Sequence, residues 1–211
     1  MKITNASFEF IDEVDGPKIL KKLEHAGRTC YKSEVKISET SSSAFVKMII
    51  ERGHETVLEH EKVSVKVVCD RGVSHEIVRH RIASYSQEST RYCNYSKDRF
   101  GNEITVIEPC FWNDSSDDDT LKYTIWKDAI DNAEKAYFKL IDAGASPQEA
   151  RSVLPNSLKT EIIMTMNLRE WRHFFKLRTS PAAHPQMLEI ARPMLDEFKK
   201  IIPVVFEDIT Y

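Results

Sequence analysis

Cysteine is scarce in this chain and irregularly spaced. The four cysteines form no CxxC pair and share no repeating interval; they are Cys30, Cys69, Cys93 and Cys110. This pattern excludes a zinc ribbon and a disulfide framework, and it is typical of a protein kept in a reducing compartment.

Long apolar runs and an excess of basic residues are also missing. No apolar segment approaches the roughly 20 residues needed to cross a bilayer, and the first residues lack the apolar h-region of a signal peptide. We therefore expect a cytoplasmic protein that has no membrane partner. The formal net charge of −3 argues against a general nucleic-acid binder, so nucleic acid is not an expected partner either.

The composition describes an ordinary globular protein. The chain has 211 residues, of which 41% are hydrophobic and 30% are charged, and this length suits one domain with a substantial core. No repeat or low-complexity linker divides the sequence. We expect a single domain over residues 1–211 with an α+β fold, in which a mixed sheet is combined with a helix-rich C-terminal half.

Hydrophobic periodicity and capping residues locate the expected elements. The expected strands cover residues 2–11 and 62–67. Helices are expected to start at Gly16-Pro17 and after Ser41–Ser43, and to cover residues 72–81, 120–143, 156–167, 168–178 and 185–201. A polar loop is expected at 113–119, and a capping box at 146–149 opens a helix that carries Arg151 in its second turn.

The segment from Arg79 to Tyr92 is the most informative part of the chain. It holds three arginines within thirteen residues, with hydroxyl side chains between them. The planar guanidinium group matches phosphate and carboxylate in two-point contacts, so the segment indicates a site for an anionic ligand. Charge patterning alone leaves a solvated basic turn as the alternative.

The order of these residues resembles a known family. Arg79-His80-Arg81, followed after seven residues by Ser89, is the signature of the flavin-dependent thymidylate synthases. The segment 54–60 is similar to the HETxxEH motif of that family, and further similar segments lie at 26–31, 150–155, 167–169 and 177–178. The resemblance runs from about residue 20 to residue 190.

The resemblance implies a reaction and its participants. The family converts dUMP to dTMP by reductive methylation, with methylenetetrahydrofolate as the carbon donor and NADPH as the reductant acting through bound FAD. It implies a homotetramer whose active sites lie at subunit interfaces. A cofactor of this kind supplies the redox chemistry, while the protein supplies positioning and electrostatics.

The resemblance also assigns roles to individual residues. Arg178 is implied to be catalytic, because it would polarise the uracil ring and favour loss of the ring NH proton. The implied flavin contacts are Thr56, Glu59, Arg79, His80, Arg81, Gln87, Asn167, Leu168, Arg169 and His173. The implied nucleotide contacts are Glu76, Ile77, Val78, Arg79, Gln87, Glu88, Ser89, Thr90, Arg91, Arg151 and Arg178.

Several residues keep alternative interpretations. His54 and His60 are consistent with buried structural groups or with a metal site that also uses Glu59, His75 and His80, although the spacing is not HExxH and we expect no metal. Ser89 is a phosphate ligand, a polar turn residue or a nucleophile, and the GxSxG elbow that would favour a nucleophile is missing. Arg178 near a helix end is consistent with dipole compensation alone.

Some positions differ from other family members. Cys30 and His173 stand where some members have serine and asparagine, and Glu76 stands where some have glutamine. Glu76 and His173 would therefore offer a ligand other side-chain groups than these members do. Two other functions remain open, namely a flavin-dependent uracil methylase that acts on RNA and a nucleotide-binding regulator without catalysis.

Overall fold

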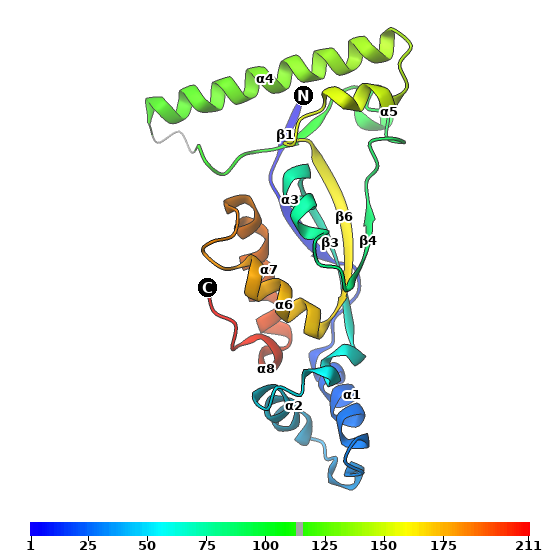
Figure 1. Ribbon diagram of the computed structural model, residues 1–211, viewed down its shortest axis with the longest axis vertical. Coiled ribbons are helices and arrows are strands. Elements are labelled where there is room, and N and C mark those ends of the chain that lie inside the picture. The colour runs from blue at the N-terminus through cyan, green and yellow to red at the C-terminus, as the bar shows by residue number, and fades with distance from the viewer. Residues whose placement is uncertain (113–115) are drawn as a thin grey trace. The chain divides into compact units, whose positions relative to one another are not determined.

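The structure of the protein is a computed structural model that describes residues 1–112 and 116–211 (Figure 1). The strands are β1 (Lys2–Thr4), β2 (Ser7–Phe10), β3 (Lys62–Asp70), β4 (Ala83–Gln87), β5 (Thr105–Ile107) and β6 (Lys159–Asn167). The α-helices are α1 (Gly16–Thr29), α2 (Ser41–Glu51), α3 (Arg71–Ile77), α4 (Asp117–Asp142), α5 (Pro147–Ala150), α6 (Leu168–Arg178), α7 (Pro185–Ile201) and α8 (Pro203–Phe206). Short 3₁₀ helices are η1 (Glu34–Lys36), η2 (Glu55–His60), η3 (Asp98–Phe100) and η4 (Arg151–Val153). The α+β class and the helix-rich C-terminal half are confirmed.

The chain forms two compact units, each assembled from three segments. Unit 1 comprises residues 1–7, 67–78 and 86–162, and unit 2 comprises residues 8–66, 79–85 and 163–211. The chain passes from one unit to the other five times, four of them inside strands β2, β3, β4 and β6 and one between Val78 and Arg79. No linker separates the units, as the sequence predicted, and the assignment of all residues to one enzyme domain stays a prediction.

The strands form two sheets. A four-stranded sheet has the order β2-β3-β6-β4, and β1 pairs in parallel with β5 in a two-stranded sheet. The alternation predicted for residues 62–67 is confirmed, since Val63, Val65 and Val67 are buried, and the strand extends to Asp70. None of the described helices is both long and apolar enough to span a membrane.

The core of unit 1 lies under helix α4. Ile130 and Tyr137 of α4 are buried in a cluster with Ile104 and Val106. Leu121 and Ile125 of the same helix are 58% and 60% exposed. The long helix therefore has a buried apolar face and a second, exposed one.

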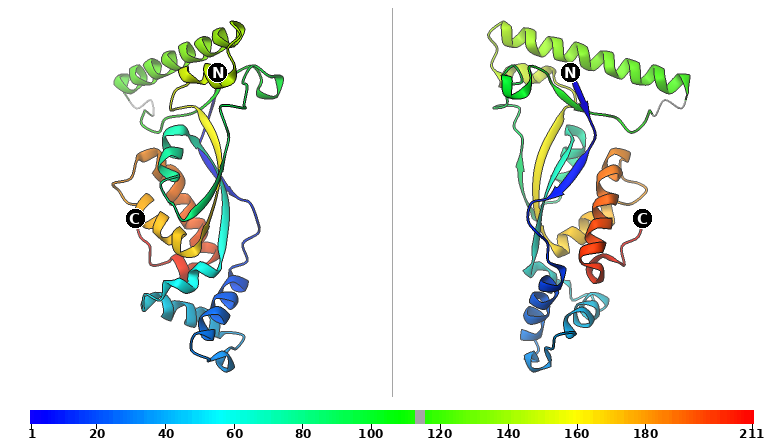
Figure 2. Two further views of the ribbon diagram at one scale, coloured as in Figure 1. Left: turned by 45° about the vertical axis from the view of Figure 1, so that its right-hand side comes forward. Right: turned by 180° about the vertical axis from the view of Figure 1, so that it is seen from behind.

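The core of unit 2 is aromatic and is built from α6, α7 and α8, of which α6 and α7 lie side by side (Figures 1 and 2). Trp171 and Phe175 of α6 stack with an interplanar angle of 26°, and Phe198 of α7 lies 4.8 Å from the Trp171 ring centroid. The indole NH of Trp171 donates to the carbonyl of Val63 at 3.1 Å. These contacts hold α6 firmly, so the residues on its exposed side are well positioned.

Five predicted elements differ from the structure. Residues 156–167 were expected to be a helix, but 159–167 form strand β6, in which alternate residues are buried with a period of two. Residues 2–11 form two strands instead of one. Helix α3 ends at Ile77, so Arg79–Arg81 lie outside it, and helix α5 ends at Ala150, so Arg151 is its C-cap. In the expected loop 113–119, residues 113–115 lie outside the described part, and α4 already begins at Asp117.

Candidate functional site

Helix α6 displays polar side chains on one side because its other side is buried in the aromatic core. Asn167 caps the helix, and its side-chain oxygen accepts the backbone NH of Glu170 at 2.9 Å. Trp171, Phe174 and Phe175 are almost fully buried. The helical repeat of 3.6 residues then leaves Arg169, His173 and Lys176 on the accessible side.

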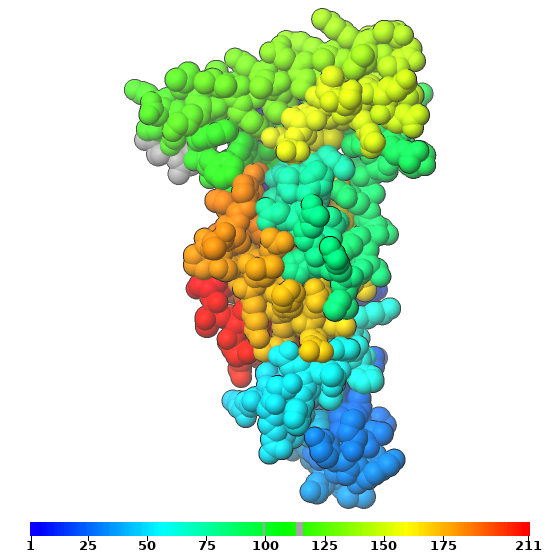
Figure 3. All heavy atoms as spheres, in the orientation of Figure 1, coloured from blue at the N-terminus to red at the C-terminus, as the bar shows by residue number. Residues whose placement is uncertain are grey.

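These side chains border a cavity of about 500 Å³ in unit 2, which we call the α6 cleft. Its lining residues are Glu55, Glu59, Ile82, Asn167, Arg169, Glu170, Arg172, His173 and Lys176. Four of the predicted flavin contacts are among them. The surfaces of η2 and α6 adjoin in the space-filling view (Figure 3). Arg169 Nη1 donates to Glu59 Oε1 at 2.6 Å across that boundary.

The remaining predicted flavin contacts of unit 2 differ in accessibility. Thr56, Arg79 and Arg81 are exposed. The Leu168 side chain is fully buried, and its backbone NH donates to Glu61. A ligand contact by Leu168 would therefore have to come from its backbone, whereas the two arginines are accessible to an anionic group.

His80 is the buried member of the Arg79-His80-Arg81 motif, with only 4% of its surface exposed. Its Nδ1 lies 3.2 Å from Glu170 Oε1, and its Nε2 accepts a hydrogen bond from Arg178 Nε at 3.1 Å. Burial lowers the pKa of His80 to about 4, and the nearby positive charges of Arg178 and His173 act in the same direction. The imidazole is therefore neutral at neutral pH, and its contact with Glu170 is a hydrogen bond between a neutral ring and a carboxyl group.

His80, Glu170 and His173 also form a possible metal-binding group. One ligand atom of each lies within 4.8 Å of the others. Both ring nitrogens of His80 already have protein partners, so binding a cation would break one of these hydrogen bonds. His54 and His60 are exposed, which excludes the buried structural role considered for them. The expectation of no metal stays a prediction.

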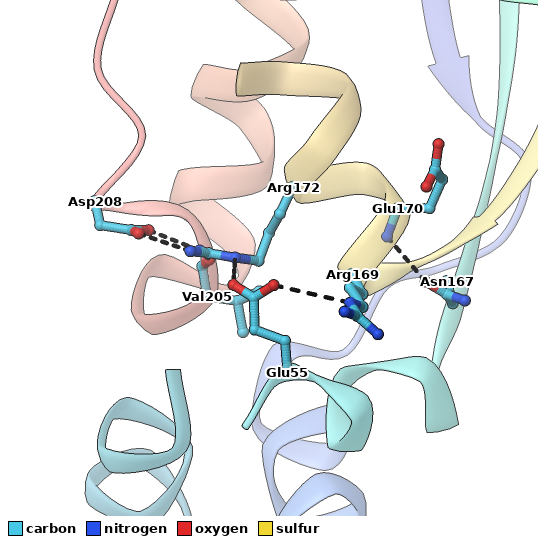
Figure 4. Close-up of polar contacts among 7 residues, drawn as sticks. All are labelled: Glu55, Asn167, Arg169, Glu170, Arg172, Val205 and Asp208. Atoms are coloured by element: carbon cyan, nitrogen blue, oxygen red, sulfur yellow. Dashed lines mark hydrogen bonds and ion pairs between the residues drawn. The ribbon is translucent and has the colours of Figure 1, made fainter. Parts of the chain in front are cut away.

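Arg172 anchors the C-terminal end of the chain to α6 (Figure 4). Only 2% of Arg172 is exposed, and its two terminal nitrogens donate to the two carboxylate oxygens of Asp208 at 2.7 Å each. Its guanidinium also donates to Glu55 at 3.3 Å and to the carbonyl of Val205. The Glu170 carboxylate points away from this network (Figure 4), so Arg172 and Glu170 serve different partners.

Five predicted nucleotide contacts of unit 1 lie in one stretch, in which Gln87 ends strand β4 and residues 88–91 follow it. Gln87 Nε2 donates to Ser74 Oγ at 2.9 Å and to Thr160 Oγ1 at 3.2 Å. Glu88 forms an ion pair with Lys159 at 3.0 Å. These partners fix the start of the loop that contains Ser89.

The rest of that loop is less uniform. Ser89 Oγ accepts the backbone NH of Arg91 at 3.3 Å, and the exposed Arg91 guanidinium lies over the Tyr92 ring.

Three other predicted nucleotide contacts lie at the end of helix α3. Val78 is exposed, Glu76 is half-buried and the Ile77 side chain is fully buried. A contact by Ile77 would therefore also have to come from its backbone.

A second cavity, of about 440 Å³, lies within unit 1, and we call it the Arg71–Arg151 pocket. Its lining residues are Arg71, Thr90, Gln148, Arg151, Ser152, Leu154, Pro155, Asn156 and Leu158. Its lining contains two guanidinium groups and no carboxylate. Arg151 Nη1 donates to Thr90 Oγ1 at 3.3 Å. Nη1 of Arg71 is buried without a hydrogen-bond partner among the described residues, and such a group favours an anionic ligand.

Two residues that the structure places in these sites, Arg71 and Glu170, were not predicted from the sequence. Arg71 directly follows the N-cap residue Asp70, and nothing in the spacing relates it to Arg151, eighty positions later. Glu170 occupies the third position of α6, where an acidic residue is common because it compensates the helix dipole. Only the contact with His80 distinguishes Glu170 from an ordinary residue of a first helical turn.

Comparisons with known proteins agree on one family. Residues 11–204 match the family described as Thymidylate synthase complementing protein. A Geobacter sulfurreducens protein named flavin-dependent thymidylate synthase is 36% identical over 190 residues, covering 87% of this chain and 78% of the relative. A protein of the same name from Mycolicibacterium gilvum is 34% identical over 218 residues, covering 95% and 82%.

A solved structure shows the same fold. The crystal structure of the UMP/dUMP methylase PolB from Streptomyces cacaoi, bound with 5-Br UMP, superposes with a TM-score of 0.79. The superposition covers 98% of this chain and 95% of that chain, at 21% sequence identity.

Proposed function

Because the chain belongs to the flavin-dependent thymidylate synthase family and is therefore an enzyme of the methyltransferase type, we propose that it converts dUMP to dTMP by reductive methylation. FAD is the proposed cofactor, NADPH the reductant and methylenetetrahydrofolate the carbon donor. When bound, FAD supplies the hydride-transfer chemistry that no side chain can provide.

The observation that carries this proposal is the composition of the α6 cleft. Glu59, Asn167, Arg169 and His173 come from segments more than a hundred residues apart, and they line one cavity. The volume lies within the range of about 300–1,000 Å³ that is usual for ligand sites. Lys176 and Arg169, which is paired with Glu59, lie beside amide and imidazole groups and the carboxylates of Glu55 and Glu170. This polar mixture suits the phosphates and the polar ring edge of a flavin nucleotide.

The remaining proposed roles belong to residues that present donors to anions. Arg178 would stabilise negative charge that develops on the uracil ring, because a guanidinium group is a planar cation with several hydrogen-bond donors. Ser89 and Arg91 would bind the phosphate of dUMP. We assign Arg71 and Arg151 to the same phosphate, because their pocket has positive charge without a carboxylate to neutralise it.

The first prediction concerns the flavin. Purified protein should be yellow, and Arg79→Ala should bind FAD at least about tenfold more weakly, because a hydrogen bond to a charged group contributes about 1.5–3 kcal/mol. Arg52→Ala is a suitable control, since Arg52 is also exposed and has no proposed role. Flavin affinity is measured by absorbance titration. A colourless wild-type protein that does not bind added FAD would refute the proposed cofactor.

The second prediction concerns the Arg71–Arg151 pocket. Arg71→Met keeps the apolar stem of the side chain but removes its charge, so it should weaken dUMP binding by about tenfold or more. Binding of deoxyuridine, which has no phosphate, should stay unchanged. Arg71→Lys should recover part of the dUMP affinity. Calorimetry with both ligands tests this, and an equal loss for dUMP and deoxyuridine would exclude a phosphate contact.

The reaction itself is tested by a defined assay. We expect NADPH oxidation by the flavin-loaded protein to depend on dUMP, and dTMP to form only when methylenetetrahydrofolate is added. A regulator without catalysis would bind the nucleotide but oxidise no NADPH. Methylation of a uracil-containing RNA with no turnover of dUMP would favour the alternative RNA methylase.

We also propose that the enzyme is a homotetramer with shared active sites. The exposed face of α4 supports a partner surface, because Leu121 and Ile125 together present an apolar stripe to solvent. Sedimentation measurements test the assembly. Charged substitutions at these two positions should dissociate it if α4 lies in an interface.

A further inference from the structure

Three buried or half-buried side chains of unit 2 are joined in one hydrogen-bonded series. Glu170 and His80 are 9% and 4% exposed. Glu170 Oε1 lies 3.2 Å from His80 Nδ1, and His80 Nε2 lies 3.1 Å from Arg178 Nε. The imidazole therefore links a carboxyl group near the start of α6 to the arginine at its end.

The chemistry of arginine determines where the imidazole proton lies. Arg178 Nε carries a hydrogen and can only donate, so His80 Nε2 must be the unprotonated, accepting nitrogen. A neutral imidazole has one NH group, which is therefore on Nδ1 and points to the Glu170 carboxyl group. Because Glu170 accepts this hydrogen, it stabilises the only neutral tautomer of His80 that can hold Arg178.

From this geometry we propose that Glu170 is a positioning residue, which acts through His80 to hold the Arg178 guanidinium in its working orientation. The inference rests on the proposed function, in which Arg178 acts on the uracil ring. Other groups around His80 do not replace this contact. The Phe174 ring packs edge-on at 5.0 Å and the His173 ring lies at 5.5 Å. The Tyr85 hydroxyl donates to the His80 backbone carbonyl at 2.8 Å.

Glu170 lines the α6 cleft but is assigned no ligand contact, so its loss should act mainly by releasing Arg178, and flavin affinity is measured on the same variant. In Glu170→Ala, the imidazole proton can move to Nε2, where it opposes the Nε–H of Arg178. We expect methylation to slow by about 10–100-fold, the usual effect of a group that orients a functional side chain. Glu170→Gln keeps an accepting oxygen and should recover part of the rate.

A double-mutant cycle tests whether Glu170 acts through Arg178. If it does, the Glu170→Ala, Arg178→Ala double variant should be no slower than Arg178→Ala alone. Glu24→Ala is the control, because Glu24 is a buried carboxylate of the same unit that accepts from Arg28 at 2.7 Å. Any loss of methylation rate in Glu24→Ala should multiply with the loss caused by Arg178→Ala when the two substitutions are combined. The proposal would be overturned if the rate losses of Glu170→Ala and Arg178→Ala also multiplied in the double variant, or if Glu170→Ala had a normal rate.

The state of His80 is measured independently of activity. In flavin-loaded wild-type protein labelled with ¹⁵N-histidine, the His80 signals should show hydrogen on Nδ1, and Glu170→Ala should shift them towards the Nε2–H form. The His80→Phe spectrum identifies the signals. A cationic ring or an Nε2–H ring in the wild type would overturn the proposal. If the Nδ1–H form is found but no dTMP is made, the proposed function fails while the hydrogen-bonded series stands.

Discussion

Arg178→Ala is expected to fold, to retain flavin and to lose methylation of dUMP by about 10²–10³-fold. This is the effect of removing one preorganised donor from a site where negative charge develops, about 2.7–4 kcal/mol of transition-state stabilisation. The loss should appear in the single-turnover rate more than in the affinity for either ligand. Arg178→Lys should recover only part of the rate, because an ammonium group does not reproduce the planar fork and cannot present the same Nε–H to His80.

Dipole compensation at the end of α6 predicts a different result for Arg178→Ala. It would cost about 0.3–1 kcal/mol of stability and leave turnover near normal. Lys200→Ala is a matched control, because Lys200 lies in the last turn of α7 and its ion pair with Glu197 is on the surface. This variant should keep full turnover. Near-normal single turnover in Arg178→Ala would make the residue structural and the catalytic assignment wrong.

The largest expected loss of stability comes from removing both carboxylates around Arg172. The Glu55→Gln, Asp208→Asn double variant leaves the guanidinium buried without an opposite charge, which typically costs about 3–5 kcal/mol. Arg172→Met in the wild-type background should cost less, because Glu55 and Asp208 are 26% and 48% exposed and can be hydrated. Urea denaturation followed by tryptophan fluorescence at one protein concentration measures both variants.

Restoration of stability is the decisive control for this ion pair. Adding Arg172→Met to the double variant removes the unpaired buried charge, so the triple variant should be more stable than the double variant. If it is not, the carboxylates stabilise the fold by another route.

The same ion pair predicts a dependence of stability on pH. The hydrogen bonds from Arg172 hold the pKa of Asp208 below its usual value. A carboxyl group with a lowered pKa contributes stability above its unfolded pKa, and that contribution is lost as the pH falls through its folded pKa. Asp208→Asn should therefore remove part of the loss of stability at acidic pH.

Sequence patterns predicted an element correctly where the burial of one face alone decides whether the segment is a strand or a helix. The alternating valines of 62–67 predicted β3, and the residues 168–178 and 185–201 were predicted as helices with the bounds of α6 and α7. The residues 156–167 were wrongly predicted as a helix. In that segment, the period-two burial of β6 depends on sheet neighbours that are distant in the sequence.

The sequence by itself determined the family, because its motifs have a fixed order and spacing, and it named four of the nine residues that line the α6 cleft, which are Glu59, Asn167, Arg169 and His173. It could not separate the roles of neighbouring residues in a motif. Tertiary structure left Arg79 and Arg81 exposed and buried His80 between Glu170 and Arg178. It also placed Arg71 and Arg151 in one pocket. The physical reason is that burial and hydrogen bonding depend on groups brought together by folding, whereas a linear pattern records only residue type and distance along the chain.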